Sequence, residues 1–296
     1  MELRTLRAFV EVIRQGGFSQ AAKTVFATQS TVSKAIKQLE DELGVTLVDR
    51  AGHRSRPTVA GEIVYRRALA MLAERDDLVA ELDELRGLKR GMLRLGLPPI
   101  GSNTLFAPLF AIYRSRYPGI EIRLVEHGSK RLEELLHAGE IDLGGLLLPI
   151  PEEFEWQDVR QEPIAAIVAA DHPMAAEGAA PIAALGGFPF ILFEAGFALN
   201  AIILEACRRA GVTPAIAARS SQIEFIFELV AAGLGIGFLP RMMVESRAHA
   251  GVRAVTLTDP GLVWHMALAW RRGGYLPDAA RAWLDVTRIH SAADGR

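Results

Sequence analysis

The stretch ATQSTVSKAIKQLE, residues 27–40, pairs the apolar repeat of an amphipathic helix with an outer face that lacks acids. Val32, Ile36, Leu39 and Leu43 recur at spacings of four, three and four residues, so they fall on one side of an α-helix. The other side carries hydroxyl, amide and ammonium groups: Gln29, Ser30, Thr31, Ser33, Lys34, Lys37 and Gln38. Within this stretch no acid occurs before Glu40. The pattern predicts a helix that packs on a core through one face and presents a polar, acid-free face outward.

Two further helices are predicted before this one. An apolar helical repeat over residues 3–13 ends at the glycine pair that starts at Gly16. Ser19 is placed to cap a second, short helix, and Thr28 is placed to cap the third, which ends at Gly44. Two short helices, a tight turn and a helix with a polar outer face form the helix-turn-helix pattern.

The segment VTLVDRAGHRSRPT, residues 45–58, predicts a small hairpin or wing after the third helix. Arg50, Arg54 and Arg56 lie near its glycine turn. Residues 1–58 hold nine Lys and Arg against six Asp and Glu, whereas residues 91–296 hold 18 against 22. The basic amino-terminal piece agrees with an anionic partner, although a difference of a few charges also fits an ordinary solvated surface.

Residues 59–88 are expected to form one long helix, because the stretch contains no proline. Its apolar positions follow alternating steps of four and three if Arg75 is allowed as one polar member: Val64, Ala68, Met71, Leu78, Leu82 and Leu85. An apolar stripe of this kind is buried when it packs on another apolar surface, here along roughly 45 Å of helix at about 1.5 Å per residue. We interpret it as a dimerisation helix; the alternative is that the stripe packs on this chain's own globular part.

A domain boundary is predicted at GLKRG, residues 87–91, after which strands and helices alternate. MLRLGLPP, IEIRLVEHG and IDLGGLLLP are strand-like and are separated by helical segments, which predicts a parallel sheet. A second run follows, with strands near 164–170 and 190–193, helices near 198–210 and 223–232, strands at GIGFLP and VWHMALAW, and a closing helix over 278–288. Two α/β lobes joined by crossing segments would leave a cleft of the kind that holds small ligands.

The composition is that of a globular protein of about two domains, with 296 residues, 50% of them hydrophobic and 23% charged. The single cysteine, Cys207, excludes an intramolecular disulfide and fits a reducing compartment. The amino terminus shows no secretory pattern, and no run of about 18 apolar residues occurs. We expect a cytoplasmic protein without a membrane partner.

The sequence contains little that would indicate an enzyme. The seven histidines show no metal-ligand spacing, and neither a G-x-S-x-G elbow nor a phosphate loop occurs. GLGIGF, residues 233–238, follows a predicted helix and enters a strand, the reverse of a dinucleotide-binding loop, so we interpret it as a tight turn. We expect no catalytic residue, no metal and no cofactor.

Residues 6–50, LRAFVEVIRQGGFSQAAKTVFATQSTVSKAIKQLEDELGVTLVDR, closely resemble the winged helix-turn-helix of LysR-type transcriptional regulators. The resemblance extends through RPTVAG, the long helix and LVAAGLGIGFLP, and so covers essentially the whole chain. It implies a DNA-binding domain, a dimerising linker helix, and an effector domain like a periplasmic solute-binding protein, usually assembled as a tetramer. LPPIGSNTLF also resembles a subgroup that responds to small carboxylates or central metabolites.

The expected fold is therefore α/β with an amino-terminal winged helix-turn-helix at residues 1–58. A linker (dimerisation) helix and hinge at 59–90 lead to a two-lobed, periplasmic-binding-protein-like effector domain at 91–296. Lobe I is assigned to about 91–161 and 266–296, and lobe II to about 162–265.

Within this family the acid-free face has a physical explanation. Duplex DNA carries one negative charge per about 1.7 Å of axis, so acids would be repelled, whereas Lys34 and Lys37 would bind phosphates. Gln29 can pair with adenine, and Ser30, Thr31 and Ser33 can reach bases or phosphates. For these hydroxyls, as for Thr28, capping of the chain's own helix is the competing role, and we favour it for Thr28.

The sequence departs from the family at two places. Many relatives have proline where this chain has Ser30, and the wing has His53-Arg54 and Pro57 where a basic residue and a leucine are more usual. The candidate wing contacts are Arg50, His53, Arg54 and Arg56. Which of them enters the minor groove stays open.

Candidate effector-binding residues follow the predicted strands. Ser102 and Asn103 precede one helix and Ser129 another, where helix N-termini favour an anion; capping is the alternative role of the serines. The walls of the cleft are expected to be apolar, or to let the ligand approach the backbone closely, at Ile100, Gly101, Leu148, Pro149, Phe197 and Ile223. The resemblance to the family's corresponding turn adds Gly235. A small carboxylate is the expected effector. His127, near the cleft, either meets an anion or is solvated.

The sequence thus predicts a ligand-responsive regulator that binds promoter DNA as a homodimer or homotetramer and contacts RNA polymerase if it is an activator. The resemblance implies that effector binding between the lobes changes their closure and the spacing of the DNA-binding domains. The alternatives are a cytoplasmic solute-binding protein without specific DNA binding and, third, a cytoplasmic enzyme. The solute-binding alternative leaves the acid-free face of residues 29–38 unexplained.

Overall fold

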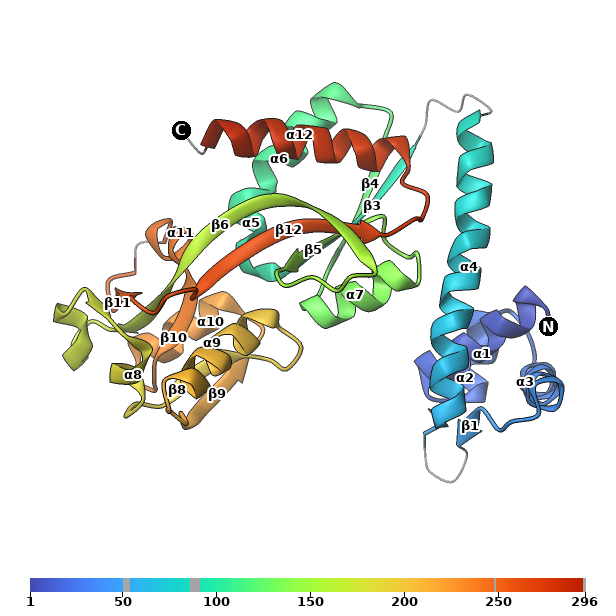
Figure 1. Ribbon diagram of the computed structural model, residues 1–296, viewed down its shortest axis with the longest axis horizontal. Helices are drawn as coiled ribbons and strands as arrows, with labels where there is room; N and C mark the ends of the chain where they lie inside the picture. Colours follow the sequence, from blue (N-terminus) through green and yellow to red (C-terminus); the bar gives the residue numbers. More distant parts are fainter. Residues whose placement is uncertain (50–53, 86–90, 248, 295–296) are drawn as a thin grey trace. The chain divides into compact units, whose positions relative to one another are not determined.

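The computed structural model describes residues 1–49, 54–85, 91–247 and 249–294, and the chain divides into two compact units (Figure 1). The amino-terminal unit contains α1 (Leu3–Gln15), α2 (Phe18–Thr24), α3 (Gln29–Leu43), β1 (Val48–Asp49), β2 (Arg56–Pro57) and α4 (Val59–Leu85). β1 and β2 pair antiparallel, with Val48 opposite Pro57. The predicted helix-turn-helix and wing are therefore both confirmed.

The apolar stripe of residues 27–40 is the buried face of α3. Val32, Ile36 and Leu39 are buried against α1 and α2, whereas Leu43, at the end of the helix, is exposed. Thr28 is the N-cap, because its Oγ1 accepts a hydrogen bond from the Thr31 amide at 3.2 Å. The helix stops at Gly44, which adopts the left-handed conformation at φ 70°.

The expected cap of α2 was wrong. Gly17 occupies the N-cap position, and Ser19 lies inside the helix. The Ser19 hydroxyl donates instead to Oε1 of Gln29 at 3.1 Å. Because an extended glycine can enter the helix without a side-chain cap, Ser19 is left to link α2 to the start of α3.

The long helix α4 has two different halves. Ala68 and its neighbours Leu69 and Leu72 are buried against the helix-turn-helix core. Met71, Leu78 and Leu82 are exposed. The predicted stripe therefore packs on its own chain near the start of α4 and presents free apolar surface further on. The boundary predicted at residues 87–91 lies largely outside the described residues.

Gly61, in the first turn of α4, shows why the wing and this helix fit together. A methyl group on Gly61 would lie 2.0 Å from the backbone oxygen of Leu47, so no larger residue fits without moving the backbone. The Gly61 amide also donates to Thr58 Oγ1 at 3.0 Å. Glycine at this position lets α4 lie directly against the chain that enters the wing.

The carboxyl-terminal unit is built on an eight-stranded sheet and a separate pair of strands. The large sheet runs in the order β4 (Glu121–Glu126), β3 (Met92–Leu97), β5 (Leu143–Leu147), β12 (Val263–Arg271), β6 (Phe154–Ala169), β11 (Val252–Leu257) and β7 (Ala179–Ala180), with β10 (Gly237–Pro240) also paired to β6. The pair is β8 (Phe190–Phe193) and β9 (Ile216–Ser220). The helices are α5 (Pro99–Leu105), α6 (Ala107–Arg116), α7 (Ser129–His137), α8 (Ile182–Leu185), α9 (Ala198–Arg209), α10 (Ile223–Ala231), α11 (Arg241–Glu245) and α12 (Asp278–Asp294), with a 3₁₀ turn at Pro173–Ala176.

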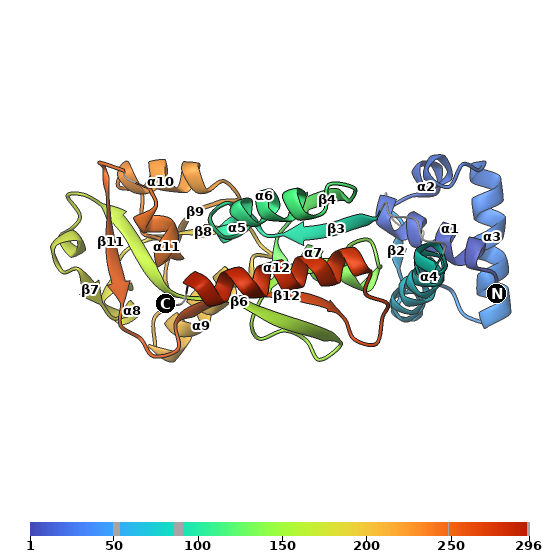
Figure 2. The same cartoon turned by 90° about the horizontal axis from the view of Figure 1, so that it is seen from above.

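Two long antiparallel strands join two lobes within this unit. β3 is parallel to β4 and β5, as predicted, but β12 runs antiparallel to both β5 and β6. β6 pairs with β12 along residues 154–163 and with β10 and β11 along 164–169, so one strand belongs to both lobes (Figure 2). Only its second half was predicted, because Pro163 and alternating charged residues obscure the first half.

Gly101 interrupts the helix that follows β3. Its φ of 89° lies in the left-handed region, and a methyl group there would meet the Trp264 ring at 2.6 Å. This kink lies within α5, and α6 begins separately after Phe106. α12 packs on α6, where Tyr113 Oη donates to the Ala279 carbonyl at 2.7 Å. No helix in the described part of the chain is long and apolar enough to cross a membrane.

Candidate functional site

The outer face of α3 is a continuous polar surface. Gln29, Ser30, Thr31, Lys34 and Lys37 are exposed and Ser33 is half-buried, all on the side opposite the buried stripe. Among the described residues, no acid pairs with Lys34 or Lys37. Both ammonium groups are therefore available to an anionic partner.

A hydroxyl network organises the amino-terminal end of α3. Thr28 Oγ1 lies 2.9 Å from Ser30 Oγ and 2.8 Å from Thr31 Oγ1, in addition to capping the helix. Ser19 holds the side-chain oxygen of Gln29, which orients the amide. The network fixes these polar groups in one geometry, as direct recognition of base edges requires.

The first acid of α3 is directed toward the wing. Glu40 Oε1 accepts hydrogen bonds from the amides of Leu47 and Val48, at 2.8 and 3.2 Å. Glu42 contacts the amino-terminal ammonium group at 2.5 Å. The sequence alone shows only that Glu40 ends the acid-free face. The structure adds that its carboxylate positions the strand leading into the wing.

The wing places two of its four candidate residues on the surface. Arg54 and Arg56 are exposed, and the Ser55 amide between them donates to the Gly16 carbonyl at 2.9 Å, which ties the wing to the end of α1. Arg50 and His53 lie outside the described residues.

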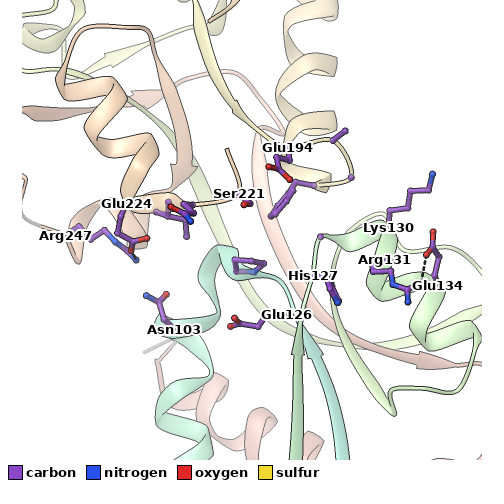
Figure 3. A pocket seen from close by; sticks show the side chains of 17 residues that line it. Asn103, Glu126, His127, Lys130, Arg131, Glu134, Glu194, Ser221, Glu224 and Arg247 are labelled. Atoms are coloured by element: carbon purple, nitrogen blue, oxygen red, sulfur yellow. Dashed lines mark hydrogen bonds and ion pairs between the residues drawn. The ribbon is translucent and has the colours of Figure 1, made fainter. Parts of the chain in front are cut away.

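A cleft of about 860 Å³ lies between the two lobes of the carboxyl-terminal unit (Figure 3). One wall comes from α5, the end of β4 and the start of α7: Pro99, Asn103, Glu126, His127, Gly128, Lys130, Arg131 and Glu134. The other wall comes from the turns after β8 and β9 and from residue 247: Glu194, Ala195, Gly196, Phe197, Ser221, Gln222, Ile223, Glu224 and Arg247. The cleft is therefore assembled at the carboxyl ends of strands, where sheets of this kind hold ligands.

Three predicted effector residues line this cleft: Asn103, Phe197 and Ile223. Ser129 is buried and borders an adjoining hollow of about 560 Å³ that shares Lys130 and Phe197 with the cleft. His127, for which the sequence allows either an anion contact or a solvated position, lines the cleft.

The structure does not place the other predicted effector residues in the lining of the cleft. Ile100 and Ser102 are buried, and the Ser102 hydroxyl donates back to the Pro98 carbonyl. Gly101 faces the Trp264 ring. Gly235 packs on the backbone of Pro189, where a methyl group would lie 2.5 Å from the carbonyl oxygen.

The last two of these residues, Leu148 and Pro149, lie beyond the end of β5 beside β12. The Leu148 amide donates to the His265 carbonyl at 3.0 Å. These two residues are therefore held by the strand that joins the lobes.

The charged residues of the cleft were not predicted from the sequence. Arg131 pairs with Glu134 at 2.8 Å, and Arg247 lies 3.6 Å from Glu224. The remaining carboxylates, Glu126 and Glu194, come from opposite walls and face the space between them, whereas Lys130 extends away from it (Figure 3). Both carboxylates directly end or follow a strand, so the rule that ligand-binding groups follow strand ends would have indicated them.

Two helix N-termini also open at the cleft. Phe197 and Gln222 are the N-caps of α9 and α10, and neither provides a side-chain cap. The first amides of these helices lack intrahelical partners and favour negative charge. Ser221 lies beside the start of α10. The cleft thus combines acids on both walls with an anion-favouring edge.

The lobes touch at one edge of the cleft. The Lys130 amide donates to the Gly196 carbonyl at 3.3 Å, and a methyl group on Gly128 would lie 3.0 Å from the same oxygen. The Phe197 ring would lie 3.4 Å from that methyl group. Absence of a side chain at Gly128 allows this close approach.

Cys207 is buried in α9, and burial raises the pKa of its thiol, which keeps it protonated and unreactive. The described residues contain no cluster of three or more His, Cys, Asp or Glu side chains that could hold a metal ion.

Comparison with known proteins gives matches along almost the whole chain. Residues 3–62 match the model for the bacterial regulatory helix-turn-helix protein, lysR family, and residues 86–292 match the LysR substrate binding domain. The chain is 36% identical to the uncharacterized HTH-type transcriptional regulator YwbI of Bacillus subtilis (strain 168), over 98% of this chain and 97% of that protein. It is 32% identical to the HTH-type transcriptional regulator BudR of Raoultella terrigena, over 92% and 95%.

The fold is also similar to solved structures. A full-length OxyR variant from Pseudomonas aeruginosa aligns with a TM-score of 0.67 at 27% identity, covering 98% of this chain and 95% of that one. Both units of the chain are thus represented together in proteins of known structure.

Proposed function

The chain belongs to the LysR family of DNA-binding transcriptional regulators, and on that premise we propose which of its residues bind promoter DNA and which bind the effector. It is a homo-oligomeric regulator with an effector-binding domain and not an enzyme. The acid-free outer face of α3 is the observation that supports the DNA-binding half of the proposal, and the charged cleft supports the other half.

In the DNA-binding half, α3 lies in the major groove. The Gln29 amide and the Ser33 hydroxyl read base edges, Ser30 and Thr31 contact bases or phosphates, and Lys34 and Lys37 bind phosphates. The wing contacts the adjacent backbone or minor groove through Arg50, His53, Arg54 and Arg56.

A fluorescence-anisotropy titration tests this half. The purified full chain is titrated onto the DNA directly upstream of its own gene and onto scrambled DNA of equal length, at two salt concentrations. We expect binding at least about 10³-fold tighter to the upstream DNA. Equal binding to both duplexes at both salt concentrations would contradict the proposal and favour a solute-binding protein without specific DNA binding.

In the effector-binding half, we propose a small molecule that carries both a carboxylate and a cationic group. Its carboxylate binds at the start of α10, near Ser221 and the free amides of the first turn. Its cationic group lies between Glu126 and Glu194, since two carboxylates that face the same space would repel a purely anionic ligand. The small carboxylate predicted from sequence is thereby narrowed to an amphoteric one.

Ligand-dependent thermal stability tests the class of effector. The full chain is heated with panels of α-amino acids, dicarboxylates and simple amines, each at a concentration well above the expected dissociation constant. We expect a rise in Tm with one or more amino acids or related zwitterions only. A rise with dicarboxylates alone would contradict the proposed role of Glu126 and Glu194.

We propose that closure of the lobes on the effector transmits binding to DNA. β6 belongs to both lobes and pairs with β12 along its first half, so bending of β6 accompanies closure and changes the spacing of DNA-binding units in the dimer or tetramer. Contact with RNA polymerase follows if the protein is an activator. We infer a cytoplasmic location, because promoter DNA is there.

A further inference from the structure

Phe26 is the most exposed large apolar side chain in the described part of the chain. Its relative exposure is 96%, although it lies between two residues that are partly buried. Val25 and Ala27 pack against the helix-turn-helix core, whereas Phe26 does not. A phenyl ring left wholly in water gains nothing for the stability of the folded chain.

The backbone of Phe26 is also unusual. Its φ is 54°, and it is the one non-glycine residue with positive φ among those the structure describes. Asparagine and glycine adopt this left-handed conformation readily, but a bulky aromatic side chain does so at a steric cost. The turn is well anchored, because the Phe26 amide donates to the Lys23 carbonyl at 3.3 Å and the Ala27 amide donates to the Ala22 carbonyl at 2.9 Å.

Phe26 lies in the turn between α2 and α3, two residues before the Thr28 cap. The surroundings in sequence are basic or neutral: no acid occurs between Glu11 and Glu40, while Lys23, Lys34 and Lys37 all fall in that interval. An exposed ring at a strained position, two residues before the cap of α3, matches a functional contact better than a folding role.

We propose that Phe26 contacts duplex DNA, packing its ring on apolar groups beside the bases that α3 reads. Duplex DNA offers two such groups, the C5-methyl of thymine in the major groove and the deoxyribose of the backbone. The proposal rests on the assignment of α3 to the major groove and adds a residue that sequence patterns do not single out. Its polar neighbours orient the helix, and Phe26 supplies an apolar contact at the edge of the interface.

The test separates a role in DNA binding from a role in folding. If Phe26 contacts DNA, its removal lowers DNA affinity and leaves Tm unchanged or higher; if it served folding, its removal would lower Tm. Full-length wild type, Phe26→Asn and Phe26→Tyr are titrated onto a duplex selected by the wild type from a random-sequence pool, and Tm is measured for each. Phe26→Asn removes the ring and relieves the backbone, so we expect an unchanged or higher Tm and an affinity for the duplex about 10-fold lower. Phe26→Tyr, which keeps the ring, is expected to bind within about two-fold of wild type.

Phe225→Asn is the matched control, since Phe225 is also an exposed phenylalanine but lies in α10 of the other unit. We expect it to leave DNA affinity unchanged. Wild-type affinity in Phe26→Asn would overturn the proposal, as would a change in sedimentation with unchanged DNA affinity, which would assign the ring to a contact between copies of the chain. Failure of the wild type to distinguish the selected duplex from scrambled DNA would instead overturn the DNA-binding assignment itself.

Substitution of single thymines by deoxyuridine distinguishes the two sources of the contact. If the ring packs on a thymine methyl, one substitution weakens wild-type binding and has no effect on Phe26→Asn. If it packs on deoxyribose, no single substitution matters, and Phe26→Asn loses affinity for selected and scrambled duplexes alike. Either result supports a DNA contact and identifies its chemical group.

Discussion

The acid-free outer face of α3 and the cleft of the carboxyl-terminal unit are built in opposite ways. The first comes from one helix, has cations but no acids over its first three turns, and is organised by local hydrogen bonds. The second is assembled from separate segments of the chain, and its lining contains both carboxylates and cations. The difference fits the proposed partners, because a polyanion requires one sign of charge whereas a small ligand is selected by the arrangement of both.

The two regions should therefore respond differently to a change of charge. An added acid on α3 opposes every phosphate within a screening length of about 8 Å. A removed acid in the cleft changes which ligand is accepted and leaves DNA binding intact. Substitutions in the two regions test this contrast, and the largest effect is expected on α3.

Ser33→Glu should reduce specific DNA binding by about 100-fold or more. The substitution places a carboxylate in the middle of the outer face of α3, where it meets base edges and phosphates. The half-buried position remains on the polar side, so Tm should stay close to wild type. Gel-shift titration and a thermal melt measure the two quantities. Ser33→Ala is the control, and unchanged affinity in Ser33→Glu would show that this face does not bind DNA.

Glu194→Gln should lower affinity for an amphoteric effector by about 10-fold and leave DNA affinity without effector unchanged. The amide keeps the size of the side chain but removes one of the two carboxylates that face the centre of the cleft. Calorimetric titration with the effector found by thermal screening provides the measurement. Improved affinity for that effector would place its cationic group elsewhere, and a parallel Glu134→Gln variant controls for the general loss of charge.

The same contrast explains what the sequence could predict. The spacing of apolar and polar residues along a helix indicates which face is buried and which is exposed. Val32, Ile36 and Lys34 are therefore enough to indicate which face of α3 packs on the core. The parallel strands and the wing were predicted by equally local patterns. Only the second half of β6 was predicted. A strand that crosses two lobes changes its surroundings along its length, so its apolar residues do not follow one period throughout.

The cleft depends on segments that only the fold brings together. Asn103, Phe197 and Ile223 were identified from their positions after predicted strands or at predicted helix starts. Ser221 follows β9, a strand that was not predicted, and Arg247 approaches from beyond α11. Ser102 and Gly101 have local roles in a kink, which sequence position cannot distinguish from ligand contact.

Gly128→Ala should weaken effector binding by roughly five-fold and have little effect on DNA affinity without effector. The added methyl group would lie 3.0 Å from the Gly196 oxygen and 3.4 Å from the Phe197 ring, so the lobes must separate slightly at this edge. Calorimetric titration measures the loss. Gly187→Ala is the control, because no atom lies within 4 Å of the added group there. Wild-type effector affinity in Gly128→Ala would show that the contact between residues 128 and 196 is not needed for closure.

Lys34→Ala should have the smallest effect, about three-fold on affinity near physiological salt, but it changes a second quantity that identifies its cause. A lysine that neutralises one phosphate releases about one condensed counterion, so its removal should reduce the slope of log affinity against log salt by about 0.9. The loss should be the same on selected and scrambled duplexes, because a phosphate contact carries no sequence information. Equal slopes for Lys34→Ala and wild type would mean that this exposed ammonium group stays in solvent. A loss confined to the selected duplex would mean that Lys34 reads a base.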